Sequence, residues 1–240
     1  MIGVILQPTY LPWLGYFEMI AAADVFVVYD HVQFVKKSWH HRNRIKDSNG
    51  ELTLTLSTKK APIKTPLYQT ELSTEYQKTL TEHWRSISHA YKKAAYFGKY
   101  SDSLQEMYLA EYSSLTDLTV SFIRYFCNHL NITTPFVTSS SFSLDKSEVN
   151  MTKRVIELCQ KSNISSLYDA HGAKALIDTN LFYSNKINIS FQNYQHPTYS
   201  QLFGDFLPNM SVLDLLLNEG PDSLEIIKKG RCDPIVISNN

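Results

Sequence analysis

Residues 2–34 read IGVILQPTYLPWLGYFEMIAAADVFVVYDHVQF, and this stretch decides the fold. Its first apolar run, residues 3–6, is typical of a strand that is buried on both faces. The run at 25–29, rich in β-branched and aromatic residues, predicts a second strand. Between them, apolar side chains recur at the spacing of an amphipathic helix: Leu14, Phe17, Ile20 and Ala21. The stretch is therefore expected to form a βαβ unit with parallel strands and a right-handed crossover.

The remaining patterns extend this α/β rhythm. Leucines that alternate with threonines around residues 52–56 predict a strand with one exposed face, whereas residues 59–73 have two prolines and no period and predict a surface loop. Further strands are expected within 135–140, 166–172 and 188–194, and helices at 149–161, 173–183 and 221–229. The last of these helices is opened by Pro221.

Two apolar stripes, at residues 80–91 and 115–130, predict helices in the middle of the chain. We expect a single α/β domain over residues 1–240, with a helical insertion at about 76–130. The fold class is α/β: a mostly parallel, Rossmann-like, three-layer sheet opened by the βαβ unit, with a helical subdomain in the middle.

Composition narrows the classes of function. The chain has 240 residues with a formal net charge of zero, so no global field recruits nucleic acid, and no nucleic-acid partner is expected. Its three cysteines are odd in number and far apart, which favours a reducing compartment. We recognise no signal peptide and no apolar stretch near the roughly 18 residues of a membrane span. A cytoplasmic protein without a transmembrane segment is expected.

Polar, aromatic motifs directly follow four of the predicted strands: LQPTYLPW, DHVQF at 30–34, DAHGAK at 169–174, and QHPTYSQ at 195–201. Ligands of open parallel sheets bind beyond the carboxyl ends of the strands. We therefore expect these segments to converge on one cleft. The histidines and cysteines lack the spacing of a metal site, and no metal is expected.

The first motif predicts a rigid turn that presents side chains. Pro8 and Pro12 restrict the backbone and remove two N–H donors, which argues against a backbone phosphate cradle. We expect Gln7 and Tyr10 to face a ligand and Trp13 to form a flat wall, whereas burial tendencies place a residue such as Phe17 in the core.

The basic run VKKSWHHRNRIK at 35–46 favours binding of a phosphate or carboxylate. Arg42 and Asn43 are its candidates, because an arginine fork binds such anions in bidentate fashion. In the fourth motif, His196 is a candidate general base and Asp214 its orienting partner. Asn209 or Ser211 could cap the helix that follows.

These motifs together resemble the WbqC-like family, from about Ile2 to Pro221. The resemblance implies a bacterial enzyme of O-antigen (lipopolysaccharide) or other surface polysaccharide biosynthesis, for which a glycine transferase role has been suggested. It leaves the donor open. A serine–glycine-rich turn is expected near 169–172, whereas this chain has D-A-H-G, so we assign that turn no ligand role.

Carried over position by position, the resemblance adds motif residues to those named above. Predicted as catalytic are His196, Asp214 and Arg42. Predicted as substrate-binding are Gln7, Tyr10, Trp13, Asp30, Gln33, Trp39, Asn43, Tyr199, Gln201 and Asn209.

Three functions fit these residues. The leading one is an acyl or aminoacyl transferase, glycyl transfer included, that modifies a nucleotide-linked or lipid-linked sugar. Arg42 would hold an anionic group, Trp13 and Trp39 would stack on a sugar or base, and His196 would deprotonate the acceptor.

The second is a nucleotidyltransferase-like, nucleotide-activating enzyme, although both histidines of the H-x-G-H turn are missing here. The third is a non-catalytic sugar-binding or scaffold protein of polysaccharide assembly. No cofactor is identified, and a nucleotide or an activated acyl or aminoacyl donor is compatible with the motifs. The sequence does not determine the oligomeric state.

Overall fold

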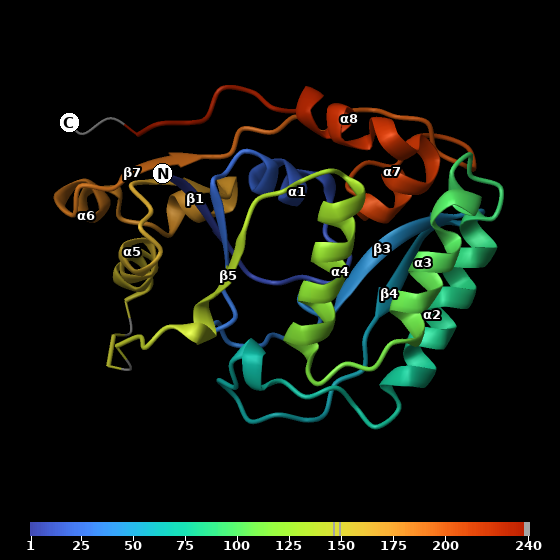
Figure 1. Cartoon of the computed structure of the whole chain (residues 1–240), viewed down its shortest axis with the longest axis horizontal. Helices are drawn as coiled ribbons and strands as arrows, with labels where there is room; N and C mark the ends of the chain where they lie inside the picture. The colour runs from blue at the N-terminus through green and yellow to red at the C-terminus, as the bar shows by residue number, and fades with distance from the viewer. Residues whose placement is uncertain (146, 149, 238–240) are drawn as a thin grey trace.

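The computed structural model describes residues 1–145, 147–148 and 150–237 and contains a five-stranded, fully parallel sheet (Figure 1). The strand order is β5-β2-β1-β6-β7. The strands span Ile2–Leu6 (β1), Val25–Val28 (β2), Phe136–Thr138 (β5), Ser166–Asp169 (β6) and Asn188–Phe191 (β7). The chain moves from β1 outward to β2 and β5, and then returns to the other side of β1 with β6. The topological switch point of the sheet therefore lies between β1 and β6.

Helices cover both faces of the sheet, which confirms the predicted three-layer α/β fold. The helices are α1 (Leu14–Ala21), α2 (Tyr76–Tyr91), α3 (Phe97–Leu109), α4 (Leu115–His129), α5 (Met151–Lys161), α6 (Thr179–Ser184), α7 (Val212–Glu219) and α8 (Ser223–Lys229). In Figure 1, α5 and α6 lie on one side of the sheet and α1 and α4 on the other. No helix in the described part of the chain is both long and apolar enough to cross a membrane.

Side-chain alternation along the strands builds two cores. Val4 and Phe26 face the larger core with α1, α4, α7 and α8, whereas Ile5 and Val27 face the smaller core with α5 and α6. Strands buried on both faces read as continuous apolar runs, which is why residues 3–6 and 25–29 were recognisable in the sequence. Phe17 is fully buried, as predicted.

The basic run contains a strand that the sequence pattern did not predict. Strand β3 (Arg42–Asp47) pairs antiparallel with β4 (Gly50–Thr55), and Gly50 in the turn has a φ of +109°. The sequence shows no apolar pattern for this strand, because its buried positions carry the polar or charged Asn43 and Lys46 as well as Ile45.

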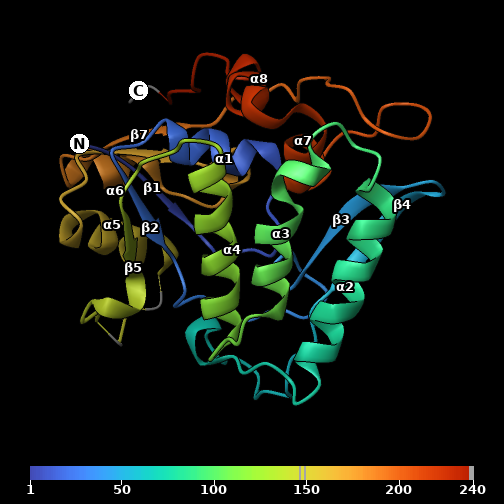
Figure 2. The same ribbon diagram turned by 45° about the vertical axis from the view of Figure 1, so that its right-hand side comes forward.

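The central helices α2, α3 and α4 lie side by side (Figure 2) and share the larger core with the sheet. Phe126 of α4 packs edge to face on Phe17 of α1, with ring centroids 5.9 Å apart. Because one continuous core joins the helices to the sheet, we propose that the chain is one domain with the helical segment as an insertion.

Two helices begin later in the chain than the sequence predicted. Residues 171–175 form a 3₁₀ turn, and α6 begins only at Thr179, because the Asp178 side chain accepts from the Asn180 N–H and caps the helix there. Likewise, α8 begins at Ser223 after a 3₁₀ turn that contains Pro221. The predicted start of α5 at residue 149 lies outside the described residues, and the helix is described from Met151.

Candidate ligand-binding cleft

The turn after β1 is held rigidly by residues from distant segments. Asn43 donates from Nδ2 to the carbonyl oxygens of Leu11 at 2.7 Å and Tyr10 at 3.2 Å. Leu11 has a positive φ of 48°, which costs a residue with a Cβ and therefore requires such support. The Val212 N–H donates to the Pro12 carbonyl at 2.8 Å. These bonds fix the side chains that follow β1.

One half of the cleft, which we call the aromatic hollow, lies against this turn and has a volume of about 310 Å³. It is lined by Thr9, Pro12, Trp13, Tyr16, Trp39, Asn43, Arg44 and Asn209. Trp39 is 49% exposed, although large apolar side chains are usually covered. The predicted site residues Trp13, Trp39, Asn43 and Asn209 are thus brought together here.

Trp13 owes its position to two neighbours. Its indole packs nearly parallel to the His196 ring, with centroids 6.4 Å apart and an interplanar angle of 16°. A Cβ at position 15 would lie 2.3 Å from the indole, so only glycine leaves room for this rotamer. The glycine at position 15, just after the first motif, is therefore explained by the placement of Trp13.

Arg44 is the arginine of the aromatic hollow, and Arg42, predicted as catalytic, is not among the residues that line it. The Ser211 N–H donates to the Arg44 carbonyl at 3.0 Å, so position 44 lies where β3 meets the segment before α7. Arg42 is placed farther along β3 and is half-buried beside His41. Arg44, and not Arg42, therefore lines this hollow, and the catalytic role of Arg42 stays a prediction.

The Arg44 guanidinium is held by Glu51 and lies near the Trp39 ring. Its NH1 binds both carboxylate oxygens of Glu51, at 3.0 and 2.9 Å, and its carbon lies 5.4 Å from the centroid of the Trp39 ring. Its Nε is buried and has no hydrogen-bond partner among the described residues. A buried donor without an acceptor is unfavourable.

The second half of the cleft, which we call the switch hollow, lies at the carboxyl ends of β1 and β6 and measures about 350 Å³. It shares Thr9 and Tyr16 with the aromatic hollow. Its other lining residues include Gln7, Tyr29, Asp169, Ala170 and Gly172. The D-A-H-G turn, to which the sequence assigned no ligand role, thus forms one wall.

A hydrogen-bond network orients Gln7. His40 accepts from the Val35 N–H at Nδ1, 3.3 Å away, so its proton is on Nε2 and is donated to Gln7 Oε1 at 2.6 Å. Burial, with His41 nearby, lowers the pKa of His40 to about 4, so the ring is neutral at pH 7. The Gln7 oxygen is therefore occupied, and its amide NH₂ is left to donate to a ligand in the switch hollow.

Tyr10 does not face the cleft, contrary to the sequence prediction. Its side chain is fully buried, and its hydroxyl lies 3.0 Å from both His83 Nδ1 and the Tyr108 hydroxyl. Burial raises the pKa of Tyr10 well above its usual value. The hydroxyl found partners in the helical layer, so this residue anchors the turn after β1 instead of contacting a ligand.

The predicted base–orienter pair of His196 and Asp214 is also not formed. His196 donates from Nδ1 to the Pro197 carbonyl at 2.9 Å and accepts from the Asn209 N–H at 3.2 Å. With both ring nitrogens bonded, His196 is not poised as a base. Burial, the larger effect, lowers the pKa of His196, so the ring is neutral at pH 7.

Asp214 is the centre of a buried network instead. It accepts from the hydroxyls of Tyr91 and Tyr199, each at 2.7 Å, and from Gln201 Nε2 at 2.8 Å. Lys46 Nζ donates to Gln201 Oε1 at 3.3 Å. Tyr199 and Gln201, predicted to bind substrate, thus attach their loop to α7 through Asp214. Ser211 caps α7, as predicted.

Asp30 and Gln33 do not line the cleft. Asp30 is buried and accepts from the Ser139 hydroxyl, the Ser140 N–H and the Ser140 hydroxyl, at 2.7, 2.9 and 2.6 Å. It therefore ties the end of β2 to the end of β5. Gln33 is exposed and forms a backbone bridge with Pro66. Their predicted substrate contacts thus find no support in the lining of the two hollows.

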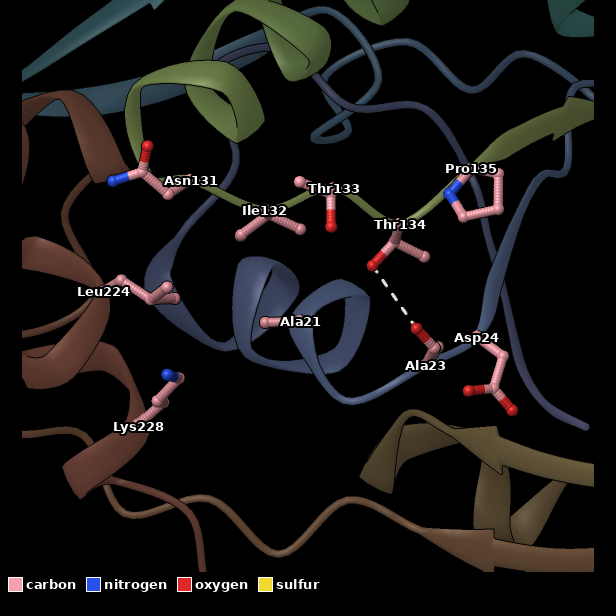
Figure 3. A pocket seen from close by; sticks show the side chains of 10 residues that line it. All are labelled: Ala21, Ala23, Asp24, Asn131, Ile132, Thr133, Thr134, Pro135, Leu224 and Lys228. Carbon is pink, nitrogen blue, oxygen red and sulfur yellow. Dashed lines mark hydrogen bonds between the residues drawn. The ribbon is translucent and has the colours of Figure 1, made fainter.

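A further hollow lies at the opposite, amino-terminal edge of the sheet (Figure 3). Three of its polar side chains have partners: Thr134 donates to the Ile20 and Ala23 carbonyls, Asp24 accepts from the Ile2 N–H, and Lys228 pairs with Glu225. No predicted site residue lies there. Within the described ranges, no group of three or more His, Cys, Asp or Glu side chains is arranged to hold a metal ion.

The doubly wound sheet and the cleft at its switch point define an α/β protein of the Rossmann-like class. The chain belongs to the WbqC-like protein family, whose sequence model matches residues 7–226. It is 32% identical over 228 residues to the uncharacterized protein Rv1507c of Mycobacterium tuberculosis, an alignment that covers 93% of this chain and 96% of that protein. No solved structure shows significant similarity to the chain.

Proposed function

We propose that this protein is an acyl or aminoacyl transferase that modifies a sugar precursor of a bacterial surface polysaccharide such as O-antigen. The observation that carries the proposal is the pair of adjoining hollows that share Thr9 and Tyr16. A group transfer requires two ligands side by side, with the reacting atoms at the boundary between their sites. Thr9 and Tyr16 are the residues at that boundary.

The aromatic hollow suits the sugar precursor. Trp13 and Trp39 offer flat apolar faces on which a sugar ring or a nucleotide base packs. The guanidinium of Arg44, which lines this hollow, suits a phosphate oxygen of a nucleotide-linked or lipid-linked sugar. The switch hollow would then hold the group to be transferred.

The three tryptophans of the chain allow a direct binding test. Trp13 and Trp39 line the aromatic hollow, whereas Trp84 stacks between Phe97 and Tyr108 in the helical layer. A nucleoside-diphosphate hexosamine is expected to quench tryptophan emission in the wild type and in Trp84→Phe. The Trp39→Ala variant is expected to bind at least about tenfold more weakly, since aromatic stacking contributes ~1–3 kcal/mol and alanine removes the ring.

Equal affinity of Trp39→Ala and the wild type would overturn the placement of the sugar precursor. The transfer itself is tested by mass spectrometry of the surface polysaccharide from cells with and without the gene. Loss of an acyl or aminoacyl substituent is expected when the gene is deleted. An unchanged glycan would count against the transferase.

One observation favours a second candidate, a nucleotide-activating enzyme. Numbered along the chain, the five parallel strands are ordered 3-2-1-4-5, the order of dinucleotide-binding folds. Calorimetry with ATP and CTP, with and without Mg²⁺, separates the two candidates. Tight nucleotide binding that does not require a sugar would favour the activating enzyme, and its absence would leave the transferase.

A further inference from the structure

The carboxylate of Asp169 is the least satisfied of the buried acids at the carboxyl edge of the sheet. The residue ends β6 and is 8% exposed. Its Oδ1 accepts from the Ala170 N–H at 2.8 Å, and neither oxygen has another hydrogen-bond partner or a cation within 4 Å among the described residues. By contrast, the buried carboxylate of Asp30 accepts three hydrogen bonds from Ser139 and Ser140.

This arrangement is unfavourable for the empty protein. Burial raises the pKa of Asp169 to about 6, only partly opposed by the hydrogen bond from Ala170. The carboxylate is therefore largely ionised at pH 7, and its charge is poorly compensated. An acid in this situation gains most from a cationic partner.

The titratable groups around Asp169 do not supply such a cation. Cys159 of α5 is neutral, because burial raises its pKa to about 12, and Tyr29 at the end of β2 has its pKa raised as well. His171 is held to the Gln192 carbonyl at 3.3 Å. Arg154 of α5 pairs with Glu157 at 2.6 Å. None of these groups is a cation that pairs with Asp169, so a cationic ligand could bind there.

The other walls of the switch hollow are mostly apolar. They come from β1, α5 and the segment after β6, and comprise Ile5, Leu6, Met151, Val155, Ala173, Leu176 and Ile177. Leu176 is 66% exposed, and Met151 is exposed as well. A ligand with an apolar body would cover these side chains and remove them from water.

We infer that the switch hollow binds a primary ammonium group with a branched aliphatic body, in which Asp169 Oδ2 accepts from the ammonium. The inference rests on the proposed function in one respect: it takes this ammonium-bearing ligand to be the amino acid that the enzyme transfers. The freed NH₂ of Gln7 suits a carbonyl oxygen of the same ligand. A glycyl group would leave most of the 350 Å³ hollow unfilled.

Other cations fit less well. Mg²⁺ and Ca²⁺ need about six or more oxygen ligands, whereas Asp169 is the single carboxylate among the described residues that line the hollow. A guanidinium binds best through two oxygens, and Asp169 Oδ1 is already bonded to the Ala170 N–H. An ammonium needs one carboxylate oxygen, which is what the hollow offers.

The inference is tested with the whole protein at pH 7 by NMR titration of two small probes of equal shape. Leucinamide carries the ammonium, and 4-methylpentanamide is its neutral counterpart. Leucinamide is expected to bind the wild type at least tenfold more tightly than the neutral amide. The Asp169→Asn variant is expected to bind both equally, whereas the matched variant Asp102→Asn, on the exposed face of α3, keeps the tenfold difference.

A second variant tests the apolar body. Ala173→Phe, which fills the hollow from the segment after β6, is expected to weaken both probes at least tenfold. Equal binding of the two probes to the wild type, or unchanged leucinamide binding by Asp169→Asn, would overturn the inference. Glucosamine binding in preference to leucinamide would also overturn it. Quenching of Trp39 by the nucleoside-diphosphate hexosamine is independent of these outcomes and tests the proposed function separately.

Discussion

Two buried aspartates near the same edge of the sheet differ in how the protein treats their charge. Asp214, in the first turn of α7, is fully buried and accepts hydrogen bonds from Tyr91, Tyr199 and Gln201. Asp169, at the end of β6, accepts one hydrogen bond from its own neighbour in the chain. Burial raises the pKa of both acids, but only Asp214 has side-chain donors that oppose the shift.

The number of hydrogen-bond donors distinguishes a buried acid with a structural role from one that is available to a ligand. A buried acid with several donors from different elements holds those elements together, and its removal leaves several polar groups unpaired. A buried acid with a free oxygen facing a hollow stabilises little and awaits a partner. Asp214 was predicted as the orienting partner of His196, yet the buried acid without a side-chain donor is Asp169.

The largest expected effect comes from removing the partnered acid. Asp214→Ala removes the acceptor for the hydroxyls of Tyr91 and Tyr199 and deprives Lys46 of a nearby negative charge. We expect a loss of about 3–5 kcal/mol in the free energy of unfolding. Urea denaturation measures it, with Asp102→Ala on the exposed face of α3 as the control. A loss no larger than that of the control would mean that the network is not structural.

The next effect concerns the neutral histidine that orients Gln7. The folded protein lowers the pKa of His40 to about 4, below an unfolded value near 6.5, so the unfolded chain binds more protons between these pH values. Stability is thus expected to fall as pH drops from about 6.5 to about 4. His40→Gln retains a donor for Gln7 and should lose ~2 kcal/mol less than the wild type between pH 7 and 4.5. Identical pH dependence of unfolding in the two proteins would refute this.

Removing the charge of the unpartnered acid is expected to stabilise the protein. The pKa of Asp169 is raised to about 6, so the folded protein binds more protons than the unfolded chain between roughly pH 4 and 6. The contribution of Asp169 to the free energy of unfolding is therefore present at pH 4 and is lost as the pH rises through 6. Asp169→Asn is expected to gain about 1–2 kcal/mol at pH 7.5 and nothing at pH 4, measured by urea denaturation. A destabilised variant at pH 7.5 would show that the carboxylate has a structural role.

The smallest expected effect concerns Tyr10, which the sequence placed at the ligand. Tyr10→Phe removes the hydroxyl from His83 and Tyr108, and we expect a loss of about 1 kcal/mol in stability. Leucinamide binding is expected to stay within twofold of the wild type, measured by the same NMR titration. A tenfold weaker affinity of Tyr10→Phe for leucinamide, without loss of stability, would mean that Tyr10 contacts the ligand.

Local patterns were sufficient for the framework. Apolar runs at 3–6 and 25–29 mark strands because strands of a parallel sheet are buried on both faces, and the Ser211 cap follows from its position before α7. The strand–helix–strand order also predicted the edge at which the cleft lies, since ligands of such sheets bind at the carboxyl ends. Gln7 and Trp13 line the cleft for this reason.

The tertiary structure alone decided which polar side chains remain free for a ligand. Tyr10 is paired with residues 73 and 98 positions away, and Asp214 with Tyr91, 123 positions away. No local pattern carries such pairs, because hydrogen bonds depend on proximity in space and not along the chain. The residue types by themselves determined at which edge of the sheet a site is expected. Only the long-range contacts show that Tyr10 and Asp214 are paired, whereas Asp169 accepts a single hydrogen bond from its neighbour.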